Sequence, residues 1–386
     1  TSSVKALPTT TSAVKEIPNT TSSKAIPTSG ATEGGSYKPS KENVKIIGRG
    51  IFNDDYLWFG LTDSGIEYKF TGKSTSISVS AEVNSGNPVR YYVYTDGKLY
   101  ADSLLEKTSS EVTIEFDEVA EHVVTFIKVS ECANGTVRIT GISADGKIEP
   151  TDVAEKKIEF IGDSITCAYG VDGKDTDTFS TKNENGVKSY AYKVAKKFNA
   201  DYSMVSYSGF GIISGYSTDG KRNEDAALPQ YYDKLGFSYW NQFDGDIKQM
   251  KEVQWNFEDF VPDLIVINLG TNDNSYMNNI SADKKKSELA AFVTEYQEFI
   301  TKIRSANPDA DILCTLGIMG QELYPQIEEA VSNYKKETGD EKVNAFKFNV
   351  QNLSKNGKAV DWHPAHQSHV DAAYELIEEI ESLYGW

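Results

Sequence analysis

The sequence is poor in the residues that build disulfide frameworks and metal sites. Only 3 of its 386 residues are cysteine and 4 are histidine. The cysteines are Cys132, Cys167 and Cys314. An odd number without paired spacing excludes a disulfide framework and a zinc-finger pattern, so we expect three buried thiols. His363, His366 and His369 could be read as a metal site, but positions three and six apart drift around a helix and lack a carboxylate ligand. The sequence therefore predicts no metal and no other cofactor.

Positive charge and long apolar runs are also scarce. The chain has 39 Lys+Arg against 57 Asp+Glu, a net charge of −18. This excess argues against nucleic acid or an anionic membrane surface as a partner. No run approaches the ~20 apolar residues of a membrane helix. What is present suits a neutral polymer instead: the 22 Tyr and 5 Trp offer flat faces to sugar rings, although such residues also fill cores.

Residues 1–42 are biased toward Thr, Ser, Pro, Lys and Ala and contain an imperfect repeat, TSSVKALPT, TSAVKEIPN, TSSKAIPT. Such a tract buries too little apolar surface to fold, and its prolines favour extended conformations. We predict a linker of the kind that joins modules of secreted proteins, with a disordered tail as the alternative. The chain opens on Thr1 inside this tract, so we expect a mature or excised fragment of an extracellular protein. A homo-oligomer is left open.

The remainder divides into two domains by the period of its apolar residues. Residues 43–150 alternate in short runs such as TSISVSAEV and VRYYVYTDG, separated by turn signals such as Asp96-Gly97. This pattern predicts an all-β domain, a β-sandwich or jelly roll. From residue 151 to 386 apolar strands (KIEFIG, YSMVSYS, DLIVINLG, DILCTLG, VNAFKFNV) alternate with helical segments. That alternation predicts a parallel sheet covered on both faces, with its ligand site at the carboxyl ends of the strands.

The residues that follow these strands have the chemistry of acyl transfer. Ser164 stands on the turn between strand and helix in IEFIGDSITCAYG; a helix N-cap motif is the plain interpretation, and a nucleophile beside backbone donors is the functional one. His363 stands at the start of the last helix and supplies a base suited to neutral pH. The backbone N–H groups of Ser164 and Gly209 and the Asn272 amide could bind an oxyanion.

Four blocks together resemble a known family. GDSIT, the glycine at 209, GTND and Asp361…His363-Pro364 occur in the order found in SGNH (GDSL-type) hydrolases. With GRGIF, WFGLTDSGIEYKFTG, TLGIMG and DWHP, residues 44–386 resemble carbohydrate esterase family two, bacterial deacetylases of plant cell-wall polysaccharides. The resemblance implies a flavodoxin-like SGNH α/β domain behind a jelly-roll domain. It also implies a serine esterase that removes acetyl groups from xylan, mannan or glucomannan, preferring the acetate of a primary hydroxyl.

Carried over to this chain, the resemblance makes Ser164 the nucleophile, His363 the general base and Asp361 the third catalytic residue, with Gly209 and Asn272 in the oxyanion hole. The last block departs from the family, because most members read Asp-x-x-His and this chain is one residue shorter. Two arrangements therefore stay open: a triad completed by Asp361, or a dyad whose histidine is oriented by a backbone carbonyl.

Substrate-binding residues are predicted less sharply. We expect Trp362 to line the cleft and stack on a sugar, Trp240 to lie in an insertion that builds the cleft, and Met319 to line the acyl pocket; Trp255, in the same insertion, is a weaker candidate. Core packing is the alternative for each aromatic residue. A carbohydrate-binding module that also holds unacetylated β-glucan in the same cleft, and an SGNH enzyme on lipid or thioester substrates, are the competing functions.

Overall fold

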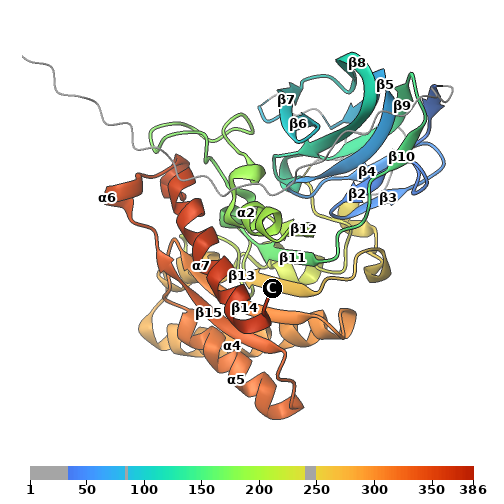
Figure 1. Cartoon of the computed structure of the whole chain (residues 1–386). Coiled ribbons are helices and arrows are strands. Elements are labelled where there is room, and N and C mark those ends of the chain that lie inside the picture. The colour runs from blue at the N-terminus through green and yellow to red at the C-terminus, as the bar shows by residue number, and fades with distance from the viewer. Residues whose placement is uncertain (1–33, 83–85, 240–248) are drawn as a thin grey trace, which may run out of the picture.

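The computed structural model describes residues 34–82, 86–239 and 249–386. Most of the predicted linker, residues 1–33, and the predicted cleft residue Trp240 lie outside these ranges. Figure 1 shows the rest as two domains side by side, an antiparallel β domain and an α/β domain, each with its own layers. An antiparallel domain followed by an α/β domain is the order that the change of period predicts.

The first domain is antiparallel throughout its described part. Its strands are β1 (Gly35–Tyr37), β2 (Lys45–Ile47), β3 (Gly50–Phe52), β4 (Leu57–Phe59), β5 (Ser64–Ala81), β6 (Val89–Thr95), β7 (Lys98–Leu105), β8 (Ser109–Lys128), β9 (Val137–Ala144) and β10 (Ile148–Pro150). The path β3-β4-β9-β5-β8-β6-β7 orders them, with β1 added to β9 and β2 and β10 added to β5. The all-β prediction is confirmed, while the finer jelly-roll assignment stays a prediction.

This domain starts earlier than the predicted boundary. Residues 35–37, at the end of the predicted linker, form β1 and pair with Ile142–Ala144 of β9. The long strands β5 and β8 pair over almost their whole length, with a shift of register between Gly72 and Ser74 of β5. Alternate residues of β5, such as Ile66, Tyr68 and Phe70, are buried in the core of this domain.

The second domain contains the predicted parallel sheet. Its strands are β11 (Lys157–Gly162), β12 (Asp201–Ser206), β13 (Leu264–Asn268), β14 (Asp311–Ile318) and β15 (Val343–Val350). Its helices are α1 (Ser164–Cys167), α2 (Tyr190–Lys197), α3 (Thr271–Met277), α4 (Ala282–Ala306), α5 (Tyr324–Thr338), α6 (Leu353–Asn356) and α7 (His366–Tyr384). The order β12-β11-β13-β14-β15, parallel throughout, is that of flavodoxin-like folds.

The strands of this sheet are apolar on both sides because helices cover both faces. Leu264 and Val266 of β13 share a core with α2 and α7. Ile265 and Ile267, which alternate with them, pack in the other core with α4 and α5. Figure 1 shows these helix pairs on opposite faces of the sheet. Because alternate side chains of a strand face opposite sides of the sheet, each strand contributes to both of these cores.

The two domains share buried contacts. Arg49 of the β domain is fully buried and pairs with Glu159 of β11, with Nη2 3.1 Å from Oε2. Its guanidinium also lies 5.3 Å from the ring centroid of Trp255. The three cysteines are buried free thiols, as predicted, and Cys132 contributes to the core that joins the domains. None of the helices in the described ranges has the length and apolar character needed to cross a bilayer.

Candidate active site

The serine turn is built by the end of β11. Asp163 is the N-cap of α1, and its Oδ1 accepts the N–H of Ile165 at 3.0 Å. Ser164 is the first residue of α1 and is 7% exposed. Gly162 has room for no side chain, because a Cβ there would meet Thr166 Oγ1 at 2.1 Å. This cap by Asp163 leaves the Ser164 hydroxyl at the carboxyl edge of the sheet.

His363 contacts that hydroxyl directly. Its Nε2 lies 2.8 Å from Ser164 Oγ, and its Nδ1 lies 3.1 Å from the backbone carbonyl of Val360. A carbonyl only accepts, so Nδ1 carries the proton and the lone pair of Nε2 faces Ser164. Burial lowers the pKa of His363 below its ordinary value. A neutral imidazole in this tautomer is the form that takes a proton from a hydroxyl.

Asp361 does not reach the imidazole. Asp361 and Trp362, in the short helix η7 (Val360–Trp362), have left-handed backbone with φ of 51° and 67°. This turn places the Val360 carbonyl beside Nδ1 of the ring, and the Asp361 carboxylate instead accepts the hydroxyl of Tyr169 at 2.9 Å. The predicted triad is therefore not formed, and the backbone-oriented alternative describes the structure. The short Asp-x-His spacing is the reason, because the turn supplies its own acceptor.

Tyr169 is a site residue that the sequence analysis missed. Its ring lies 4.3 Å from that of His363 between centroids and stacks on Phe179 at 4.0 Å. Together with the bond to Asp361, these contacts hold the imidazole from its side. The only signal in the sequence was the place of Tyr169, two residues after the end of α1.

Gly209 and Asn272 come to the same edge. Gly209 follows β12 with φ of 82°, which favours glycine. Asn272, in the first turn of α3, donates from Nδ2 to the Phe210 carbonyl at 2.7 Å and to Asp163 Oδ2 at 3.3 Å. The amide therefore ties the serine turn to the loop of Gly209. Its use as an oxyanion donor stays a prediction.

Asp273 holds the loop after β12. Its carboxylate accepts three backbone N–H groups at 2.7–3.1 Å, those of Ile212, Ile213 and Ser214. Burial raises the pKa of Asp273 to about 6 and that of Asp163 to about 7. The two carboxyls fix loops and do not contact the Ser164 hydroxyl.

The predicted substrate-binding residues differ in exposure. Trp362 is 58% exposed beside His363, and Lys358 Nζ lies 3.1 Å from its ring centroid. Met319 is half-buried just beyond β14 and packs against the core under α7. Trp255 is buried beside Arg49, so core packing is its role. Among the predicted residues that the structure describes, Trp362 is the exposed aromatic side chain, and Lys358 lies over its ring.

The histidine cluster does not gather around a common point. His369 is buried, and its Nδ1 accepts the N–H of Tyr190 at 3.3 Å. Within the described ranges, the one group of side chains with metal-ligand chemistry is Glu131, Cys167 and Glu184, which contains no histidine.

With the serine, histidine and surrounding loops placed, comparison with known proteins identifies the family. Residues 158–376 match the GDSL-like lipase/acylhydrolase family. The chain belongs to that family. Residues 46–152 match the N-terminal domain of carbohydrate esterase 2, which confirms the resemblance to carbohydrate esterase family two. This GDSL-family protein is therefore a carboxylic ester hydrolase.

Named relatives are carbohydrate esterases. The cellulase/esterase CelE of Acetivibrio thermocellus is 34% identical over 91% of this chain, which spans only 41% of the relative. An acetylxylan esterase/glucomannan deacetylase of Cellvibrio japonicus is 27% identical over 90% of both chains. The structure of a family two carbohydrate esterase from Clostridium thermocellum with cellohexaose superposes with a TM-score of 0.76, at 30% identity, over 89% of this chain and 99% of that one.

Proposed function

We propose that this GDSL-family esterase is an extracellular bacterial enzyme that removes O-acetyl groups from plant polysaccharides by a Ser164–His363 dyad. The contact of 2.8 Å between His363 Nε2 and Ser164 Oγ carries the proposal. The bond from Nδ1 to the Val360 carbonyl supports the dyad, because it supplies the orientation that a carboxylate supplies in a triad.

The reaction has two steps. His363 takes the proton of Ser164 as Oγ bonds to the acetyl carbon, and the carbonyl oxygen becomes an oxyanion. The C–O bond to the sugar then breaks, and His363 gives the proton to the departing sugar oxygen. Water, deprotonated by His363, attacks the acetyl-serine, releases acetate and restores the serine. No cofactor takes part.

The oxyanion donors are proposed to be the N–H groups of Ser164 and Gly209 and the Asn272 amide. Asn272 Nδ2 reaches Asp163 by the longer of its two bonds, 3.3 Å, so the N–H on that side is the one proposed to donate to an oxyanion. Donors that are fixed before reaction need no reorganisation as charge develops.

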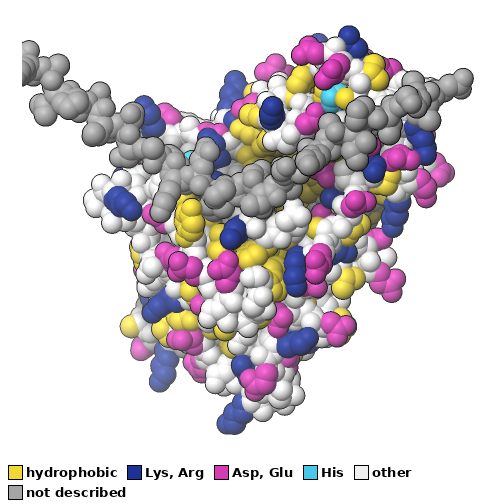
Figure 2. Space-filling view, viewed as in Figure 1, with side chains coloured by type: hydrophobic (Ala, Val, Ile, Leu, Met, Phe, Trp, Pro, Cys, Tyr) yellow, Lys and Arg dark blue, Asp and Glu magenta, His cyan; other side chains and the backbone are white. Residues whose placement is uncertain are grey.

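The substrate is proposed to be acetylated xylan, mannan or glucomannan, with the sugar ring on Trp362. The C. japonicus relative deacetylates xylan and glucomannan by name, and the exposed Trp362 ring suits a pyranose face. On the face in Figure 2, acidic and basic side chains are interspersed, as suits a neutral polymer. Ser164→Ala is expected to abolish acetate release from each polysaccharide, and undiminished release would disprove the proposal.

A second role, binding of unacetylated β-glucan in the same cleft, is favoured by one observation. The C. thermocellum esterase was solved with cellohexaose. We expect retarded migration of this protein in gels that contain soluble cellulose or glucomannan, with Trp362→Ala as the control that restores mobility. Equal mobility with and without polysaccharide would remove this role.

A further inference from the structure

Glu131 is a buried carboxylate that the β domain places behind the active site. It lies between the end of β8 and the short helix η1 (Cys132–Asn134) and is 2% exposed. Its Oε2 accepts the backbone N–H of Ser208 at 2.7 Å and lies 3.9 Å from the Cys167 thiol. Ser208 precedes Gly209, and Cys167 ends the helix that Ser164 begins. One oxygen from the other domain thus contacts both loops of the site.

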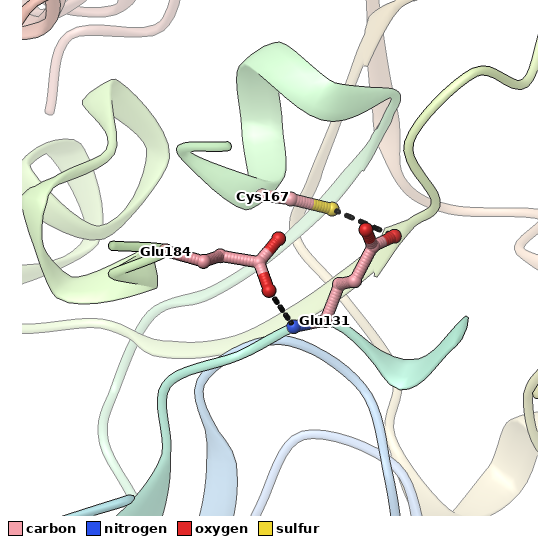
Figure 3. A group of neighbouring side chains, drawn as sticks. All are labelled: Glu131, Cys167 and Glu184. Carbon is pink, nitrogen blue, oxygen red and sulfur yellow. Dashed lines mark hydrogen bonds between the residues drawn. The ribbon is translucent and has the colours of Figure 1, made fainter. Parts of the chain in front are cut away.

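Glu131 is itself fixed from several sides. Its N–H donates to Glu184 Oε2 at 2.9 Å, and its carbonyl accepts Lys128 Nζ at 2.8 Å. Asn134 Nδ2 donates to the other carboxylate oxygen at 3.3 Å. Figure 3 shows the Glu131 side chain pointing to Cys167 while its backbone nitrogen meets Glu184. Because the backbone and both oxygens are engaged, the carboxylate has little freedom to move.

The charges of this cluster favour a hydrogen-bonded scaffold over a metal site. Lys128 is fully buried within the same cluster, and its ammonium opposes the effect of burial, which raises the pKa of both Glu131 and Glu184. The Glu131 oxygen nearest Cys167 already accepts a backbone N–H. Burying an ammonium and two carboxyls is costly unless they are paired, so a specific arrangement is being maintained here.

We propose that Glu131 is a positioning residue of the esterase: it holds the Ser208–Gly209 turn so that the Gly209 N–H faces the oxyanion. The proposal rests on the proposed function, because it assigns Gly209 to the oxyanion hole. It also gives the β domain a part in catalysis. If the Glu131 carboxylate no longer reaches the Ser208 N–H, the Ser208–Gly209 turn can shift and the Gly209 N–H is misplaced. We expect this to lower kcat roughly 10–100-fold.

Two substitutions of Glu131 distinguish the effect of the position of its acceptor oxygen from the effect of its charge. Glu131→Asp keeps the charge but shortens the side chain by one methylene, so its oxygen no longer reaches Ser208. Glu131→Gln loses the charge but keeps an acceptor oxygen at the same reach, and the partly exposed Asn134 can turn its amide to suit. Glu184→Gln, in the same cluster but without contact to Ser208, is the matched control.

With 4-nitrophenyl acetate we expect kcat of Glu131→Asp to fall roughly 10–100-fold at unchanged KM, while Glu131→Gln and Glu184→Gln stay within about threefold of wild type. The inhibition constant of phenylboronic acid, whose adduct with Ser164 carries a tetrahedral oxyanion, should rise in parallel for Glu131→Asp. Retained activity in the Asp variant, or a larger loss in the Gln variant, would overturn the proposal.

Wild-type protein provides an independent measurement. The Ser208 amide should exchange slowly with solvent deuterium, because it donates to a buried carboxylate; rapid exchange would also overturn the proposal. An inactive wild type would instead refute the proposed esterase function, so the two failures are distinguishable.

Discussion

The substitution Asp361→Asn distinguishes a backbone-oriented dyad from a triad. Asn tolerates left-handed backbone nearly as well as Asp, so the turn at φ of 51° is kept. What is lost is the charged acceptor for the Tyr169 hydroxyl at 2.9 Å. A net hydrogen bond to a charged group contributes about 1.5–3 kcal/mol. Even if all of it reached the transition state, kcat would fall by no more than about 150-fold.

A carboxylate that orients a catalytic histidine makes a much larger difference, about 10⁴ in kcat when it is replaced by its amide. The assay is steady-state hydrolysis of 4-nitrophenyl acetate and acetate release from acetylated glucomannan. Tyr169→Phe is the matched control, since it removes the other partner of the same bond and should have a similar small effect. A loss beyond about 10³ in Asp361→Asn alone would refute the dyad.

Three further predictions follow from the structure. Because burial lowers the pKa of His363, the imidazole stays neutral to lower pH, and kcat/KM should rise with pH to half its maximum below the ordinary value of 6.5; a midpoint above that value would contradict it. Arg49→Ala leaves the buried Glu159 carboxylate without its charged partner and should lower the free energy of unfolding by about 3–5 kcal/mol in urea titrations. Lys147→Ala removes one member of an exposed ion pair and should leave the free energy of unfolding unchanged. Trp362→Ala should raise KM about 2–10-fold on acetylated polysaccharide and not on 4-nitrophenyl acetate, and an equal effect on both would exclude sugar stacking.

The sequence predicts the catalytic pair because both of its members are locally encoded. The apolar strand before Ser164 and the Asp163 cap define a strand–turn–helix unit without reference to distant residues. A parallel sheet then brings the carboxyl ends of its strands together, which is why Gly209, Asn272 and His363 could be expected near Ser164. Ser164, Gly209 and Asn272 stand just beyond β11, β12 and β13, whereas α6 and η7 separate His363 from β15.

The features that the sequence did not predict depend on long-range contacts or on residues with a positive φ angle. The position of the Asp361 side chain depends on the positive φ angles of Asp361 and Trp362. Neither residue type predicts such an angle by itself. Glu131 and Arg49 act across the domain boundary, and a periodic pattern within one domain carries no information on its partner. Strand β1 pairs with β9 more than 100 residues away, so its short sequence appeared to belong to the linker.

The most direct test of the central claim is to trap the acyl-enzyme. Wild-type protein mixed with 4-nitrophenyl acetate, quenched in acid and digested, should show the mass of one acetyl group on the peptide that contains Ser164. His363→Ala should show little adduct, because its serine lacks a base, and Ser164→Ala should show none at that peptide. If Ser164→Ala still releases acetate, or if the acetyl group appears on another residue in wild type, the Ser164–His363 account is wrong.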